Sequence, residues 1–512
     1  MEIAAPEQIK DRLQKILQLR DDELMRDSIR ILTFETVSGG TPEQEKKYRE
    51  QIPECYRWLE KVAMGMGFNF RHWDHRVAEI EWALEPIAGE GKRPTFGIAS
   101  HIDVVTPAGN WTHPPFAGQV ADGVLYGRGT QDDKGPLIQA LYGMYAAKEA
   151  GIRPCCDVRL IIGSSEETGD WSDIDLYLKK RGAPDYSFTP DADFPIITGE
   201  KGMINVRFMA SWPRVAPHGE THMEFVSLNG GSRSNIVPAG AEATLRFPVE
   251  NKHDVMKEMV RETTRYTVEN RGSNITLIPN NEKDSEGAGY YEALISFIGK
   301  AAHSSTPAKG HNAITDSLRF FADIETLPDD VRNFIRFLAI IASETDGSTI
   351  GIDHSHAFVG DTTAVLSILQ IGQNGGEGLL NVRPTMGQSP QEVLEKAHLA
   401  AAAYTKATGL QIDVEPRDGR MVEAIFLDPE KPGVGKFLGS LQSAYTLATG
   451  RPAETVAIGG TTYAKALPNC CAFGPVLPGV DEELAHQADE RMALESIRRN
   501  ALIYGLSIAL MK

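Results

Sequence analysis

The chain has 512 residues, of which 52 are Lys or Arg and 70 are Asp or Glu, so its formal net charge is −18. This acidic balance argues against nucleic acids and anionic membrane surfaces as partners, because both carry negative charge. The composition, with 41% hydrophobic and 24% charged residues, is that of a folded globular protein, and no apolar run reaches the ~18 residues that a membrane span needs.

The beginning of the chain and its cysteines predict a cytoplasmic protein. Residues 1–20 are charged and lack the apolar stretch of a secretory signal peptide. The five cysteines are odd in number and form no CxxC pair. Because adjacent cysteines rarely bridge each other, we expect reduced, buried thiols.

Helical stretches and short apolar runs alternate along the N-terminal part of the chain. Residues 1–30 and 137–150 have the pattern of helices. Three apolar runs are predicted strands that lead into polar residues: 95–100 leads to His101 and Asp103, 158–163 to Glu166 and Glu167, and 186–189 to Asp191. This alternation favours βαβ units and a largely parallel sheet, in which ligands bind at the carboxyl ends of the strands. We therefore expect these polar side chains to share one site with the Asp132–Asp133 pair.

Residues 205–425 have a different pattern, which predicts a separate α+β domain. Two stretches, 224–278 and 364–414, share the order strand, glycine-rich loop, strand with an arginine, helix and strand. We interpret them as an internal pseudo-repeat, with chance similarity as the alternative. The first pattern resumes later, so the sequence predicts a catalytic domain of 1–204 and 426–512 that is interrupted by the middle domain.

The polar strand endings carry the residue types of a dinuclear metal site. Two divalent cations about 3.5–4 Å apart need a shared carboxylate, further oxygen and nitrogen ligands, and a nearby base. The candidate ligands are His101, Asp132 or Asp133, Glu166, Glu167, Asp191 and His486. Without cations, so many converging carboxylates would repel one another and be costly to bury. We predict two divalent metal ions. Zinc is the first choice because it accepts both His and carboxylate ligands, and manganese and cobalt are the alternatives.

Five motifs follow one another along the chain: HIDVV at 101–105, GRGTQDDKGP at 127–136, SSEETG at 164–169, PDADFP at 190–195 and AHQADE at 485–490. In this order they resemble the dinuclear zinc exopeptidase superfamily of aminoacylases, carnosinases and acetylornithine deacetylases. The match looks closest to the bacterial PepV-type dipeptidases. The resemblance implies an α/β fold with a mixed sheet flanked by helices, an inserted α+β lid, and hydrolysis of the amide bond of a dipeptide.

The resemblance also implies a role for each residue that matches a motif. The implied metal ligands are His101 and Asp191 for one ion, Glu167 and His486 for the other, and Asp132 as the bridge. Asp133 remains the alternative bridge, because it is adjacent. Asp103 would orient the His101 ring through its second nitrogen. Glu166 would be the general base that takes a proton from the attacking water and delivers it to the leaving amine.

Residues of the middle domain and of one later loop would contact the substrate. The implied substrate contacts are Asn235, His303, Arg383, Gly460 and Thr461. His303 would stabilise the oxyanion, and Arg383 would bind the terminal carboxylate of the peptide. Gly460 and Thr461 would present backbone donors to the same end of the substrate.

Two alternatives to a dipeptidase remain open at this point. An N-acyl-amino-acid deacylase would use the same ions but would accept an acylated amine. A non-catalytic peptide-binding relative would have lost a ligand or the base, whereas every such position is filled in this sequence. The resemblance further implies that the second half of the lid replaces a partner subunit, so we expect a monomer whose partner is a small peptide.

Overall fold

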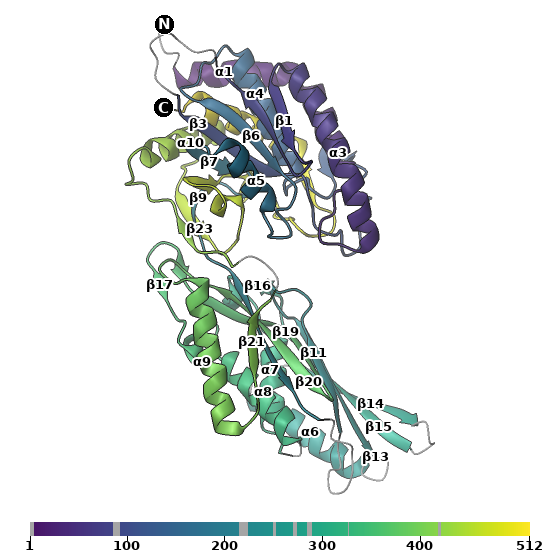
Figure 1. Ribbon diagram of the computed structural model, residues 1–512. Coiled ribbons are helices and arrows are strands. Elements are labelled where there is room, and N and C mark those ends of the chain that lie inside the picture. Colours follow the sequence, from purple (N-terminus) through teal and green to yellow (C-terminus); the bar gives the residue numbers. More distant parts are fainter. Residues whose placement is uncertain are drawn as a thin grey trace. The chain divides into compact units, whose positions relative to one another are not determined.

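The computed structural model describes residues 5–84, 93–213, 224–248, 252–269, 274–283, 289–325, 327–417 and 421–511. These residues divide into two compact units (Figure 1). Unit 1 contains the chain up to Glu200, Ile425–Ala457 and the chain from Thr461 onward, and unit 2 contains Lys201–Ala424 and Ile458–Gly460. The predicted domain boundaries after residues 204 and 425 stay predictions, and residues 1–4 of the predicted helix 1–30 lie outside the described residues.

Unit 1 is built on a mixed sheet with the strand order β1-β2-β6-β3-β7-β24-β9-β22, and β23 pairs with β9. The strands are β1 (Asn69–Trp73), β2 (Val77–Trp82), β3 (Thr95–His101), β6 (Asp157–Gly163), β7 (Tyr186–Thr189), β9 (Ile196–Glu200), β22 (Ile425–Phe426), β23 (Thr455–Ile458) and β24 (Cys470–Ala472). Every residue of β3 is buried, as expected for a strand that is covered on both faces.

The predicted mixed sheet is confirmed, but the sheet is parallel only at its centre. The pairs β3–β6, β3–β7 and β7–β24 are parallel, whereas β1–β2, β2–β6, β24–β9 and β9–β22 are antiparallel. The sequence pattern had predicted a largely parallel sheet. The difference arises partly because a short turn joins β1 to β2, and so short a connection permits only antiparallel pairing.

Helices flank this sheet (Figure 1). They are α1 (Pro6–Leu19), α2 (Asp21–Leu32), α3 (Pro42–Gly65), α4 (Lys134–Glu149), α5 (Ser172–Arg181), α10 (Val434–Thr449) and α11 (Leu494–Ala509). The helical pattern predicted over 1–30 is present, but as two helices: the backbone leaves the helical conformation at Arg20 (φ −114°, ψ 17°), and three acidic residues then favour a new helix start in the first turn of α2. α4 crosses α11 closely at Gly143, where a Cβ atom would lie 2.6 Å from the Ala501 oxygen.

Two small sheets connect segments of unit 1 that are far apart in the sequence. β26 (Arg491–Ala493), β5 (Val124–Tyr126) and β4 (Gln119–Ala121) form one, and β8 (Ala192–Asp193) and β25 (Pro475–Val476) form the other. The β26–β5 pairing places the segment just after His486 beside the segment just before Asp132. These pairings therefore bring the C-terminal motif to the N-terminal ones.

Unit 2 contains an antiparallel sheet with the strand order β14-β15-β13-β11-β19-β20-β10-β21. Its strands are β10 (Ile204–Ser211), β11 (Glu224–Gly230), β13 (Gly240–Pro248), β14 (Asn274–Lys283), β15 (Gly289–Ile298), β19 (Thr363–Gly372), β20 (Gly375–Arg383) and β21 (Asp413–Pro416). Its helices are α6 (Lys252–Glu269), α7 (Ala313–Ala322), α8 (Asp329–Ile341) and α9 (Pro390–Thr408). Buried residues alternate with less buried ones along β10, which indicates a sheet that is covered on one face.

Apart from the two-residue strand β12 (Ile236–Val237) in the first stretch, both stretches of the predicted pseudo-repeat contain two strands, a helix and a further strand. They correspond to β11-β13-α6-β14 and to β19-β20-α9-β21, and β11 pairs with β19 in the sheet. The pseudo-repeat itself stays a prediction. Within the described ranges, no helix has both the length and the apolar character that crossing a membrane requires.

Candidate metal centre

The parallel strands of unit 1 bring the N-terminal motifs to one edge of the sheet. β3 ends at His101, which is the register partner of Gly163 at the end of β6. The SSEETG motif follows β6 directly, and Asp191 follows the end of β7, the other parallel neighbour of β3. Because these strands run in the same direction, the residues after their carboxyl ends converge.

Two groups of candidate metal ligands meet at Asp132. His101, Asp132 and Asp191 form the first group, and Asp132, Glu167 and His486 form the second, with the ligand atoms of each group within 4.8 Å of one another. His101 Nε2 lies 3.0 Å from Asp132 Oδ1 and 3.7 Å from Asp191 Oδ2. His486 Nε2 lies 2.9 Å from Asp132 Oδ2 and 3.0 Å from Glu167 Oε2. Asp132 thus directs one carboxylate oxygen toward each group, as a bridging ligand would.

The buried atoms of these groups fit divalent cations. His101 Nε2, Asp132 Oδ1 and His486 Nε2 are buried but have no hydrogen-bond partner among the described residues, although a carboxylate or imidazole atom lies close to each of them. Buried polar atoms normally have a hydrogen-bond partner. Several buried atoms that lack one and lie close together therefore need an explanation. A donor set of two imidazoles and three carboxylates suits zinc, which accepts both kinds of ligand.

Burial and mutual charge shift the pKa values of these side chains. Burial opposes the charged form of His101, but contacts with three neighbouring aspartates outweigh it and raise the pKa of this imidazole well above its usual value. The charge of Glu167 raises the pKa of His486. Burial and the charge of Asp132 raise the pKa of Asp191 to about 8. Cations that bind must displace the protons on these imidazoles and carboxylates, because metal ligation requires deprotonated side chains.

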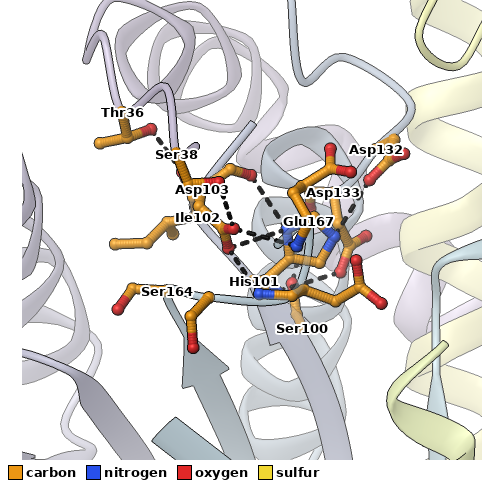
Figure 2. Close-up of polar contacts among 12 residues, drawn as sticks. Thr36, Ser38, Ser100, His101, Ile102, Asp103, Asp132, Asp133, Ser164 and Glu167 are labelled. Carbon is orange, nitrogen blue, oxygen red and sulfur yellow. Dashed lines mark hydrogen bonds and ion pairs between the residues drawn. The ribbon is translucent and has the colours of Figure 1, made fainter. Parts of the chain in front are cut away.

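Asp103 connects the His101 ring to the SSEETG turn (Figure 2). His101 Nδ1 lies 3.0 Å from the backbone oxygen of Asp103 and 3.4 Å from its carboxylate Oδ1. An Nδ1–H that donates to this oxygen leaves Nε2 unprotonated and able to bind a cation. The carboxylate of Asp103 accepts hydrogen bonds from the backbone N–H groups of Glu166 (3.2 Å) and Glu167 (3.1 Å) and from the Ser38 hydroxyl (2.9 Å).

Glu166 and Asp133 lie beside the two ligand groups but belong to neither. Burial and the charge of Asp191 raise the pKa of Glu166 well above its usual value. Asp133 is fully buried, is joined to Asp132 by a cis peptide bond, and its Oδ2 accepts a hydrogen bond from the backbone N–H of His101 (3.3 Å). The sequence left either aspartate as the bridge, and in the structure only Asp132 is shared by both groups.

The predicted substrate residues of unit 2 include two that are neighbours. β16 (Ala302–His303) pairs with β12 (Ile236–Val237), and the backbone N–H of Ser304 donates to the backbone oxygen of Asn235 over 2.9 Å. Arg383 ends β20, is buried, and donates from Nε to Asn381 Oδ1 over 3.2 Å. Gly460 belongs to unit 2, whereas Thr461 begins a segment of unit 1 and accepts a hydrogen bond from Lys465 Nζ over 3.0 Å.

Three buried residues that support the metal centre were not singled out from the sequence. Glu490 and Gln131 are hydrogen-bonded to the segments that carry Asp132 and His486. Tyr463 donates to Asp173, whose carboxylate accepts from the N–H groups of Ser164 and Ser165 at the start of the SSEETG motif. Gln131 lies inside the GRGTQDDKGP motif and Glu490 inside the AHQADE motif. Their place in these motifs is the one sequence signal that could have identified them.

Comparisons with known proteins agree with this site. Residues 97–509 match the model of peptidase family M20/M25/M40. The chain is 32% identical over 448 residues to Beta-Ala-Xaa dipeptidase of Lactobacillus delbrueckii subsp. lactis, covering 86% of each protein. It is 28% identical over 494 residues to putative dipeptidase YtjP of Bacillus subtilis (strain 168), covering 96% of this chain and 97% of the relative.

Two solved structures have the same fold at low sequence identity. Human carnosine dipeptidase 1 matches with a TM-score of 0.54 and 14% identity, covering 98% of this chain and 99% of that one. The di-peptidase Dug1p of Saccharomyces cerevisiae matches with a TM-score of 0.56 and 12% identity, covering 98% of each chain. Together these findings confirm the superfamily resemblance that the five motifs carried.

Proposed function

The chain belongs to peptidase family M20/M25/M40 and is therefore a peptide-bond hydrolase, and from this premise we propose that it is a metal-dependent dipeptidase that cleaves the single amide bond of free dipeptides. The observation that carries the proposal is the shared position of Asp132 between two groups of His and carboxylate ligands. The dipeptidase names of two relatives, each matched over most of its length, support the substrate class.

The proposed ligands divide between two divalent cations. His101 and Asp191 would hold one, Glu167 and His486 the other, and Asp132 both. When bound, the cations would supply Lewis-acid polarisation of the scissile carbonyl and would lower the pKa of a water molecule. We propose zinc as the metal, because the donor set mixes imidazole nitrogen with carboxylate oxygen.

Glu166 is the proposed general base. Its carboxylate would accept a proton from the attacking water and then donate that proton to the nitrogen of the leaving amine. Asp103 fixes the backbone N–H of Glu166, and the backbone oxygen of Glu166 accepts a hydrogen bond from Trp171 Nε1 over 3.3 Å. A side chain that must hold a proton in mid-reaction suits a buried position among carboxylates, where the protonated form is favoured.

His303 is proposed to donate a hydrogen bond to the oxyanion. The backbone N–H of Ser305 lies 3.3 Å from His303 Nδ1, and the Ser305 hydroxyl lies 2.6 Å from it. Because a backbone N–H can only donate, Nδ1 accepts, and the ring proton of the neutral imidazole is on Nε2. This tautomer presents the donor that a developing negative charge needs.

Four further residues are proposed to bind the substrate. Arg383 would pair with the terminal carboxylate of the peptide, for which a guanidinium is suited, and Asn235, Gly460 and Thr461 would contact the same ligand. We also propose that residues 205–425 are an inserted domain with an internal repeat, and that the protein acts as a monomer. The adjacent positions of β11 and β19, the first strands of the two stretches, support the repeat.

The proposed function is tested with matched substrates: free dipeptides, their N-acetylated forms and tripeptides, each offered to the zinc-loaded protein. We expect cleavage of the free dipeptides alone, and loss of this activity when a chelator is added. A site that accepts only two-residue peptides with a free amine would cleave neither the N-acetylated dipeptides nor the tripeptides.

The other outcomes of this test assign different functions. Cleavage of N-acetylated substrates in place of free ones would indicate a deacylase and would leave the metal centre intact. No cleavage of any substrate by protein that holds two ions would contradict a dipeptidase.

A further inference from the structure

Two buried side chains connect the segment that carries Asp132 to the segment that carries His486. Glu490 has no solvent exposure, and Gln131 is 3% exposed. Each belongs to one segment and makes its hydrogen bonds to the other. We call this reciprocal pair the Glu490–Gln131 clasp.

Glu490 holds the loop that ends at Asp132. Its Oε2 accepts from Arg128 Nη1 (2.6 Å) and from the backbone N–H of Gly129 (3.1 Å). Its Oε1 accepts from the backbone N–H groups of Gln131 (2.8 Å) and Asp132 (3.3 Å). Four donors from the five-residue stretch 128–132 therefore converge on one carboxylate, and the last of them belongs to the shared ligand itself.

Gln131 holds the chain on both sides of His486. Its Nε2 donates to the backbone oxygens of Glu482 and Arg491, each over 2.8 Å, and its Oε1 accepts from the backbone N–H of Leu484 over 2.8 Å. All three hydrogen bonds of this amide thus go to the segment that carries His486. In addition, Gly127 N–H donates to the backbone oxygen of Glu490 over 2.9 Å.

We propose that the Glu490–Gln131 clasp is a positioning device that sets the spacing between Asp132 and His486, and thereby the affinity of the protein for both cations. Glu490 fixes the ligand that the two groups share, and Gln131 fixes a ligand of the second group alone. The inference rests on the metal centre of the proposed function, but neither residue of the clasp is itself a ligand there.

The chemistry of the clasp fits a role in orienting metal ligands better than a role in stabilising the fold. A buried ion pair such as Glu490–Arg128 is costly to desolvate, and apolar residues of similar volume often stabilise a fold as well or better. A carboxylate, however, can accept four hydrogen bonds from fixed directions, which apolar packing cannot do. Residues that orient metal ligands through hydrogen bonds typically change metal affinity by about 10–100-fold when they are replaced.

The test compares two variants that should weaken zinc binding in different patterns. Glu490→Gln places an amide N–H₂ against N–H donors, which frees the Asp132 loop, so we expect both zinc affinities to fall by about 10–100-fold. Gln131→Met keeps the side-chain volume but releases the His486 segment, so we expect only one of the two affinities to fall. Both are measured by calorimetric zinc titration of the metal-free proteins, with the visible spectrum of the cobalt-loaded proteins as a second readout.

Asp481→Asn is the matched control. Asp481 lies in the same C-terminal segment, has a side chain that is 6% exposed, and accepts hydrogen bonds from Leu477 N–H, the Ser496 hydroxyl and Arg499, none of which is a candidate ligand. We expect this variant to lower the melting temperature while its zinc affinities and cobalt spectrum stay as in the wild type.

The outcomes separate this inference from the proposed function. Wild-type zinc affinities in both clasp variants, or an equal loss in Asp481→Asn, would overturn the clasp as a positioning device while the metal centre stands. Failure of the wild-type protein to bind zinc would overturn the metal centre and the clasp with it. If Glu490→Gln does not fold, Gln131→Met decides alone: loss of one affinity supports the inference, and no loss overturns it.

Discussion

Replacement of Glu166 by Gln should lower kcat by about 10²–10⁴-fold while two ions stay bound. Glutamine has nearly the same shape but cannot accept a proton from the attacking water. Glu166 belongs to neither ligand group, so the variant should keep its metal content. The measurement combines steady-state kinetics on a free dipeptide with metal analysis of the same sample. We expect the loss in kcat and little change in KM, because the substitution removes an interaction of the transition state.

Glu50→Gln is the control for this substitution. Glu50 is exposed on α3 and makes no contact with the ligand groups, so kcat should match that of the wild type. Residual activity of Glu166→Gln within a few-fold of the wild type would assign the proton transfer to another group. Loss of bound metal in this variant would instead make Glu166 a ligand.

Asp132→Asn should weaken the binding of both ions, with activity falling by about 10²-fold or more at limiting zinc. The two oxygens of Asp132 are directed at different histidines, and an amide can offer only one neutral oxygen in their place. Zinc titration of the metal-free variant measures both affinities directly. The expected result is two weak sites, because the substituted residue belongs to both groups.

Asp133→Asn provides a matched comparison at the adjacent position. Burial raises the pKa of Asp133 well above its usual value, so a neutral amide resembles the form that the protein already favours. An Asn oxygen can still accept the hydrogen bond from the His101 N–H. We expect zinc affinities close to those of the wild type. The reverse pattern, with metal lost in Asp133→Asn and kept in Asp132→Asn, would make Asp133 the bridge.

Strand endings were the most informative feature of the sequence. Runs such as 95–100 and 158–163 end in residues that can bind metal, and parallel strands bring such endings together. For this reason the parallel centre of the sheet, the candidate ligands and the family could be predicted from the sequence, whereas the antiparallel strands at both sides of the sheet could not. The break at Arg20 could not, because apolar spacing continues across it and the acidic turn that follows is also compatible with a helix interior.

The choice between Asp132 and Asp133 and the role of Glu490 depend on backbone geometry. Neighbouring aspartates have the same chemistry, and only the direction of each side chain separates a shared ligand from a partner of the His101 N–H. Three of the four donors to Glu490 are backbone N–H groups, which every residue except proline carries. Such backbone contacts cannot be predicted from the residue types and are seen only in the folded structure.

The central claim is that this protein cleaves dipeptides with two divalent cations that share Asp132. Its most direct test is to titrate the metal-free wild-type protein with zinc and to record the hydrolysis rate of a free dipeptide at each step. We expect no hydrolysis before zinc is added, and a rate that rises until two equivalents are bound per chain. Undiminished hydrolysis by the metal-free protein, or a rate that is complete with one equivalent bound, would contradict the claim.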